Sequence, residues 1–387
     1  MTRTDSVRGR IALMVAHCAG MVDLVALPVW VGTLIARYRF DPQQAGLLAT
    51  LFLGGAVLAS IILAPRFQRL AGRWVATLGF GMAALAFWVA SQVETFGAMA
   101  MLHASAGLAT GAALSVTHGT IARSTNPHRL FAIVGMALGL FAVVFLAATP
   151  PLVASAGRAA LFLVFAGVMT VASLVSLAAF PVADALNEST RSAHAAAPLP
   201  AAVWFGIVGV SGMGLVQAMT FSFLERVGSD RGFGLQAVTA VLIALGLVNL
   251  FPAVLAAFLE RRWAARSVML VGPVLQASLV AVIMNATTFA PYAAAASVFA
   301  AVMIFTHTFA FGLLSRMDRT GRAMAATPAM LMVGAAIGPV LGGTLVKVFG
   351  YGALSVAALV ISAVAVFCFS RIPQPAPMPA SGAGMVA

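Results

Sequence analysis

Charged residues are scarce in this chain of 387 residues, where Asp, Glu, Lys and Arg together make up only 8%. A soluble domain averages about 25% charged residues, so this composition excludes an ordinary soluble fold. Hydrophobic residues make up 62% of the chain. We therefore expect an integral membrane protein.

Cysteine is also rare, since only Cys18 and Cys368 occur and both lie in apolar runs. This excludes a disulfide framework and matches neither a zinc nor a redox motif. The net charge is +12, but the arginines stand in small groups between apolar runs, which argues against a nucleic-acid partner. No nucleophile elbow, phosphate-binding loop or acid pair is found. We therefore expect neither an enzyme nor a cofactor.

Apolar runs of roughly 20 residues, the length that crosses a bilayer as a helix, recur along the whole chain. Their continuity excludes the alternating pattern of a β-barrel, and only helices or closed barrels satisfy the backbone in lipid. The stretch 267–315 carries no charge and is too long for one crossing, so we divide it at 285–291. The sequence thus predicts twelve membrane-spanning helices, at about 11–36, 45–64, 74–92, 96–122, 130–150, 159–180, 201–224, 235–258, 267–285, 290–314, 323–346 and 353–370.

The basic residues predict the orientation of these helices, because Lys and Arg favour the cytoplasmic side. With the N-terminus inside, sixteen of the 22 lie in segments on that side and six lie on the other. The bias recurs loop by loop. We therefore expect both termini in the cytoplasm and the chain in the inner (plasma) membrane.

The longest internal connection, 181–200, is rich in Ala, Pro and polar residues and falls between spans six and seven. This composition is typical of a flexible linker. The two halves echo each other, since Gln44-Ala45 enters span two and Gln236-Ala237 enters span eight. We expect four parts: an N-terminal six-helix bundle at 1–183, a cytoplasmic linker at 184–200, a C-terminal six-helix bundle at 201–370 and a disordered tail at 371–387.

Two degenerate motifs support a family resemblance. Residues 63–73, LAPRFQRLAGR, keep Arg66 and Arg73 of a loop that in relatives reads G-x-x-x-D-R-x-G-R-R, and His103 opens an R-x-x-x-G-x-x-x-G pattern in place of its arginine. With six plus six spans and a central loop, the chain resembles the major facilitator superfamily. The resemblance implies an all-α membrane fold of two pseudo-symmetric bundles, a monomer, and a central cavity lined by spans one, four, seven and ten.

Asp23 is the only one of the ten acidic residues that the predicted spans place well inside an apolar run; the other nine fall in charged connections or at span ends. A carboxylate at that depth costs roughly 3 kcal/mol by the smaller estimates and more by the larger ones. Such a residue normally faces a protein interior or water. We interpret Asp23 as a proton-coupling site, against the alternative that it only fixes helix packing.

Four histidines fall in the spans that the resemblance assigns to the cavity: His17 in span one, His103 and His118 in span four, and His307 in span ten. Because histidine titrates near neutral pH, His103 is interpreted as a partner of Asp23 or a second proton carrier. The other three are candidate substrate contacts. The alternative for His17 and His118 is that they simply meet water near the cytoplasmic ends of their spans.

Two further residues are candidate substrate contacts. Gln217 is the one amide at mid-depth in span seven, and Trp30 lies two turns after Asp23, where it could stack on a flat solute. The alternative for Trp30 is an interfacial anchor.

A metal site is the competing interpretation of the same spans. Methionine, thiol and imidazole at helical spacing are soft ligands that suit Cu(I), although Met in an apolar helix usually packs. The candidate ligands are Met14, His17, Cys18, Met21, Met99, His103, Met303 and His307.

Three functions therefore stay open. The first is a proton-coupled secondary transporter that moves a small neutral or weakly acidic organic solute by alternating access, because few charges line the predicted cavity. The second is a transition-metal (copper) importer, and the third is a non-transporting assembly or receptor protein. The expected partners are a small solute, protons and the lipid bilayer, and the direction of transport stays open.

Overall fold

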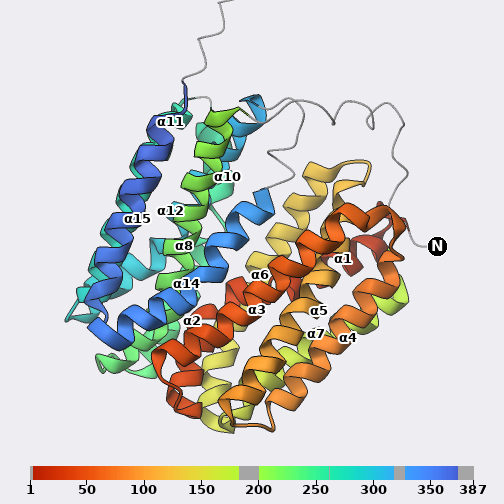
Figure 1. Cartoon of the computed structure of the whole chain (residues 1–387), viewed down its shortest axis with the longest axis horizontal. Coiled ribbons are helices and arrows are strands. Elements are labelled where there is room, and N and C mark those ends of the chain that lie inside the picture. The colour runs from red at the N-terminus through yellow and green to blue at the C-terminus, as the bar shows by residue number, and fades with distance from the viewer. Residues whose placement is uncertain (1–2, 183–199, 261, 318–326, 374–387) are drawn as a thin grey trace, which may run out of the picture.

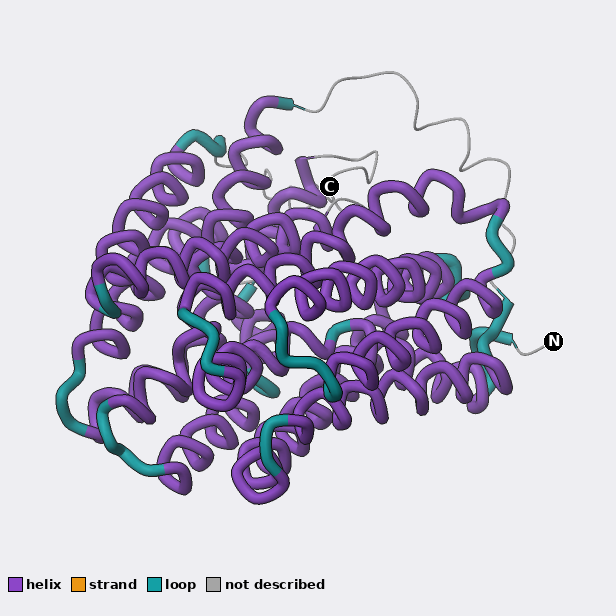
Figure 2. The backbone as a smooth tube through the Cα atoms, turned by 60° about the horizontal axis from the view of Figure 1, so that its bottom comes forward, coloured by secondary structure: helices purple, strands orange, loops and turns teal. Residues whose placement is uncertain are grey.

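The computed structural model of the chain describes residues 3–182, 200–260, 262–317 and 327–373. The described elements are all helices, and Figures 1 and 2 show no strand among them. Most of the predicted linker and tail, 184–199 and 374–387, lies outside the described residues. The helices are α1 (Val7–Gly20), α2 (Val22–Tyr38), α3 (Pro42–Leu63), η1 (Ala64–Arg69, a 3-10 helix), α4 (Gly72–Ala90), α5 (Phe96–Ala122), α6 (Pro127–Ala156), α7 (Ala159–Ala179), α8 (Ala201–Asp230), α9 (Leu235–Val248), α10 (Pro252–Leu259), α11 (Ala265–Asn285), α12 (Phe289–Met317), α14 (Thr327–Phe349) and α15 (Gly352–Ser370).

Twelve stretches of these helices are long and apolar enough to cross a membrane, which confirms the predicted number. Two of the twelve are interrupted. The first consists of α1 and α2, and the eighth consists of α9 and α10, which begins at Pro252. Proline has no N–H to donate and is tolerated only in the first turn of a helix without distortion. The sequence predicted neither interruption, because both lie within continuous apolar runs.

The helices form two bundles that lie side by side, α1–α7 in one and α8–α15 in the other (Figure 1). This confirms the predicted all-α fold. We call the end that carries residues 3–6, 180–182 and 371–373 the linker end. The opposite end, which carries the turns at 39–41, 231–234 and 350–351, is the far end.

Glycines set how closely helices approach within the N-terminal bundle. A Cβ added to Gly107 of α5 would lie 2.7 Å from the backbone carbonyl carbon of Phe52 on α3, and one added to Gly111 would lie 2.8 Å from that of Ala56. No larger residue fits at such an approach. The two glycines of the span-four motif therefore hold α5 against α3.

The bundles meet most closely at the far end, where α3 packs on α14 and α2 packs on α8. The N–H of Val340 donates to Oγ1 of Thr50 at 3.1 Å, and Nζ of Lys347 lies 3.0 Å from Oδ2 of Asp41. Backbones also touch, because a Cβ added to Gly46 of α3 would lie 2.7 Å from the carbonyl carbon of Pro339. The molecule is therefore closed between its bundles at the far end.

Candidate functional site

The interruption of the first span creates the candidate site. α1 ends at Gly20 and α2 begins at Val22, and Met21 between them has φ −110° and ψ 18°. Asp23 thus stands in the first turn of α2, in the middle of a span. The partial positive charge at a helix N-terminus favours an anion there. This helix end can therefore support a carboxylate that lipid would not tolerate.

Asp23 is 2% exposed, and its carboxylate interacts with the backbone N–H groups of Asp23 and Leu24. Its Oδ1 atom has no hydrogen-bond partner among the described residues. Pro28, four residues after Leu24, lacks the N–H that would bond to the carbonyl of Leu24. Asp23 is therefore a buried carboxyl group with spare hydrogen-bonding capacity beside an irregular piece of backbone.

His103 is not the partner of Asp23 in this conformation. Its Nδ1–H donates to the carbonyl oxygen of Met99 at 2.7 Å, and its Nε2 is buried with no partner among the described residues. The ring is fully buried inside the N-terminal bundle, where its centroid lies 5.4 Å from that of Phe162. The sequence suggested that His103 could pair with Asp23, and the structure shows no hydrogen bond between the two.

Trp30 belongs to the same aromatic cluster as His103. Its ring centroid lies 5.5 Å from that of His103, 5.2 Å from Phe52 and 4.8 Å from Phe165. The side chain is 0% exposed, and its Nε1 has no partner among the described residues. Here the ring contacts bundle interior rather than an open cavity, so a stacking role would require a different conformation.

His17 and His118 form a pair that the sequence did not predict. Nδ1 of His17, on α1, lies 3.0 Å from Nε2 of His118, on α5, and the ring of His118 also packs against Phe131 of α6. His17 is 7% exposed. One imidazole therefore donates to the other inside the bundle, and His17 is not simply meeting water.

In the C-terminal bundle, Gln217 of α8 accepts a hydrogen bond from Nε2 of Gln276 of α11 at 3.2 Å. Gln276 also donates to the carbonyl of Met213 at 3.2 Å, so it ties α11 to α8. His307 of α12 packs against Phe311, with ring centroids 5.0 Å apart. Each of the two candidate contacts of this bundle thus has a partner of its own, and no hydrogen bond or ring contact between Gln217 and His307 is found among the described residues.

The candidate metal ligands do not form one cluster. His17 and His103 have different neighbours, and the described residues contain no group of three or more His, Cys, Asp or Glu side chains that could hold a metal ion. Met303 is 5% exposed and belongs to the apolar core of the C-terminal bundle. The copper interpretation thus gains no assembled site here.

Glu225 is a functional candidate that the sequence analysis missed. It was placed at the end of span seven, but α8 continues to Asp230, and the Glu225 carboxylate lies against Gly32 of α2, across the bundle interface. The signal in the sequence was weak, because the charges at 225–231 resemble an ordinary helix end. Glu225 lies near the end of its span, as expected, but there it contacts the other bundle.

Asp41 ties the bundles together at the same far end. Burial opposes ionisation of Asp41, but the N–H of Gln44 and the ammonium group of Lys347 outweigh it and hold the pKa of this carboxyl group below its usual range. Nζ of Lys347 also lies 3.3 Å from Oε1 of Gln43. This polar contact therefore joins α3 and its preceding turn to α14.

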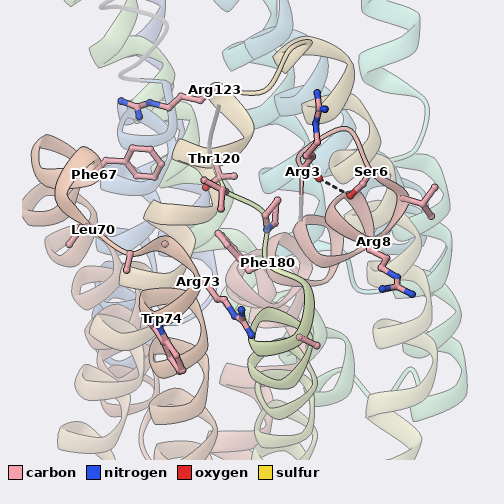
Figure 3. Close-up of a pocket in the computed structure, with 16 residues that line it drawn as sticks. Arg3, Ser6, Arg8, Phe67, Leu70, Arg73, Trp74, Thr120, Arg123 and Phe180 are labelled. Carbon is pink, nitrogen blue, oxygen red and sulfur yellow. Dashed lines mark hydrogen bonds between the residues drawn. The ribbon is translucent and has the colours of Figure 1, made fainter. Parts of the chain in front are cut away.

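A large cavity lies elsewhere, at the linker end of the N-terminal bundle (Figure 3). Its volume is about 1000 Å³, and the guanidinium groups of Arg3, Arg8, Arg73 and Arg123 spread around it rather than converge. Arg123 lies over the ring of Phe67 at 4.8 Å. All the lining residues belong to the N-terminal half, so this cavity is not a site between the bundles.

Comparison with known proteins identifies the class. The sequence profile of the Major Facilitator Superfamily matches residues 12–317, so the chain belongs to this family of membrane transporters and is not an enzyme. Comparison with curated proteins finds no significant match.

Solved transporter structures share the fold over nearly the whole chain. A bacterial homologue of the human lysosomal transporter Spinster, in an inward-facing and occupied conformation, is 13% identical, with a TM-score of 0.71 and coverage of 94% of this chain and 93% of that one. The nucleoside transporter NupG is 16% identical, with a TM-score of 0.68 and coverage of 95% and 98%. A D-xylose-proton symporter is 13% identical, with a TM-score of 0.71 and coverage of 94% and 97%.

Proposed function

We propose that this transporter couples the movement of a small neutral or weakly acidic organic solute to protons by alternating access, and that Asp23 carries the coupling proton. The observation that supports this most directly is the buried carboxyl group of Asp23, with its free Oδ1, at the interruption of the first span. Interrupted helices of transporters commonly carry the substrate and ion sites.

The coupling follows from the change in surroundings that alternating access imposes. With the bundles closed at the far end, a proton on Asp23 has no exit toward that end. When the bundles rock, the same group exchanges with the other side. A carboxyl group that holds its proton more readily when buried than when it meets water can carry one proton per cycle.

The basic residues support an orientation with the linker end in the cytoplasm of the inner (plasma) membrane. In that orientation the structure is closed to the outside. The scarcity of charge near Asp23 disfavours highly charged solutes, and the similar folds that act on nucleosides and on D-xylose make uridine and D-xylose the first solutes to test.

The test uses the purified protein in liposomes that enclose a pH-sensitive dye. Uridine, D-xylose and benzoate are added in turn, and the proposal expects one of them to change the internal pH beyond the change seen in protein-free liposomes. Asp23→Asn should abolish this change while Glu94→Gln, which alters an exposed acid at the far end, should retain it. A solute-driven pH change that survives in Asp23→Asn would contradict the role of Asp23.

A further inference from the structure

Glu225 is a half-buried acid that the mechanism above does not use. It lies on α8 near the far end, and a Cβ added to Gly32 of α2 would lie 3.2 Å from its Cδ atom. The carboxylate therefore rests directly on the backbone of the other bundle. In this structure, where the far end is closed, the contact joins the two bundles.

The described residues around Glu225 supply a hydrogen bond, but none of their cationic groups pairs with its carboxylate. Oγ of Ser229 donates to Oε1 of Glu225 at 2.8 Å. Arg226, the next residue, pairs with Asp230 instead, with Nη2 2.7 Å from Oδ1. Arg37 of α2 donates to the carbonyl of Ala154 at 3.4 Å.

The other elements around Glu225 bring no further charge. A cavity of about 130 Å³ adjoins the carboxylate, and α6 and α9 line it with Pro150, Val153, Ala154 and Leu235. Tyr292 of α12 is near, but its hydroxyl group donates to the carbonyl of Leu224 at 2.8 Å. The charged groups that face this region are thus Arg37, Arg226 and Asp230, each with another partner.

We propose that Glu225 is a second proton-binding site, which holds the far end closed when its carboxyl group is neutral and lets the bundles part when it is ionised. The proposal rests on the proposed proton-coupled function, to which it adds the proton-controlled gate. Holding a carboxylate against the backbone of the other bundle, with part of its surface removed from water and no paired cation, costs free energy, whereas a neutral acid can donate within the interface. When the bundles part, water reaches the group and favours the charged form.

Proton binding to Glu225 sets the direction in which pH shifts the ratio of open to closed molecules. Because the closed far end accommodates the neutral acid better, low pH should favour closure and high pH should favour opening. The ratio of open to closed molecules should change up to about tenfold for each pKa unit by which the two states differ. The contact between Asp41 and Lys347 acts in the opposite sense, so the two effects can be separated.

The experiment measures the far-end distance by pulsed electron paramagnetic resonance on the full chain. Spin labels are placed at Thr95 in the N-terminal bundle and Thr288 in the C-terminal bundle, both exposed in turns at the far end. Cys18→Ala and Cys368→Ala remove the native thiols. Distances are recorded at about pH 5 and about pH 9, on either side of neutrality and above the ordinary pKa of Glu.

The proposal expects a longer distance to gain population at the higher pH in the parent protein. Glu225→Gln should give the short distance at both pH values, Glu225→Asp should keep the pH response, and the matched control Glu94→Gln should behave as the parent does. A parent without a pH response, or a Glu225→Gln variant that responds as the parent does, would overturn the proposal.

Asp23→Asn separates this proposal from the proposed function. If Asp23→Asn abolishes the pH response and Glu225→Gln does not, the gate proton belongs to Asp23 and the proposal for Glu225 fails. The measurement needs no solute, so the gate can respond to pH even in a protein that shows no coupled transport. A folding defect is detected by comparing the melting temperature of each variant with that of the parent.

Discussion

The close approach of α3 to α14 makes Gly46→Ala a sharp test of far-end closure. The added Cβ would lie 2.7 Å from the carbonyl carbon of Pro339 and 3.2 Å from Cα of Val340. Both neighbours are backbone atoms, which cannot swing aside as a flexible side chain can. Overpacking of this kind costs about 1–3 kcal/mol, so the ratio of open to closed molecules should rise by roughly 5- to 150-fold.

Gly54→Ala is the matched control, because Gly54 lies on the same helix and an added Cβ would have nothing within 4 Å. Both variants gain the same helix propensity, so their difference isolates the contact between bundles. With spin labels at Thr95 and Thr288, Gly46→Ala should populate the longer distance and Gly54→Ala should not. A Gly46→Ala protein that stays closed would refute the interpretation of this approach as a gate contact.

Three further predictions concern charge and packing. Because the pKa of Asp41 is lowered in the closed state, its contact with Lys347 stabilises closure above the usual carboxyl range and is lost as pH falls; Asp41→Asn should therefore raise the open population at neutral pH in the same distance measurement, and an unchanged distribution would count against the contact. His118→Ala leaves His17 without its partner and should lower stability by about 1–3 kcal/mol, seen as a lower melting temperature; an unaltered melting temperature would argue against the buried pair. Trp30→Ala removes the central ring of the aromatic cluster and should lower the free energy of unfolding by about 3–5 kcal/mol. A loss below about 1 kcal/mol would contradict the packing described.

The fold was predictable because the membrane limits the choice. Apolar runs of bilayer length must become helices when water is absent, and that rule suffices for twelve spans and two bundles. The interruption at Met21 was not predictable in the same way, because no proline stands at the break and the residues around it, apart from His17 and Asp23, are apolar. Where a helix breaks inside such a run depends on what its neighbours offer the freed backbone groups.

Among the candidate site residues, only Asp23 was predictable from the sequence. Asp23 stood out because a lone acid in an apolar run is costly and therefore rarely idle. The contacts of the histidines were not predictable, because His103 and His118 share a helix face but lie about 22 Å apart along it. They consequently meet different helices, Trp30 of α2 for His103 and His17 of α1 for His118.

The contact of Glu225 with the other bundle was not predictable from the sequence. Its neighbours in sequence are charged, so its position resembles a helix end in contact with water. Only the packing of α2 against α8 covers part of its side chain, and that contact joins residues almost two hundred positions apart. Burial between two bundles has no local signature.

The most direct test of the account compares two modes of transport by Asp23→Asn in liposomes, with whichever of uridine, D-xylose or benzoate the parent protein carries. The account predicts that Asp23→Asn still exchanges labelled for unlabelled solute, because the bundles can still rock, but no longer accumulates solute when a pH gradient is imposed. Glu94→Gln should do both. Accumulation by Asp23→Asn at the rate of the parent would contradict the claim that the proton rides on Asp23.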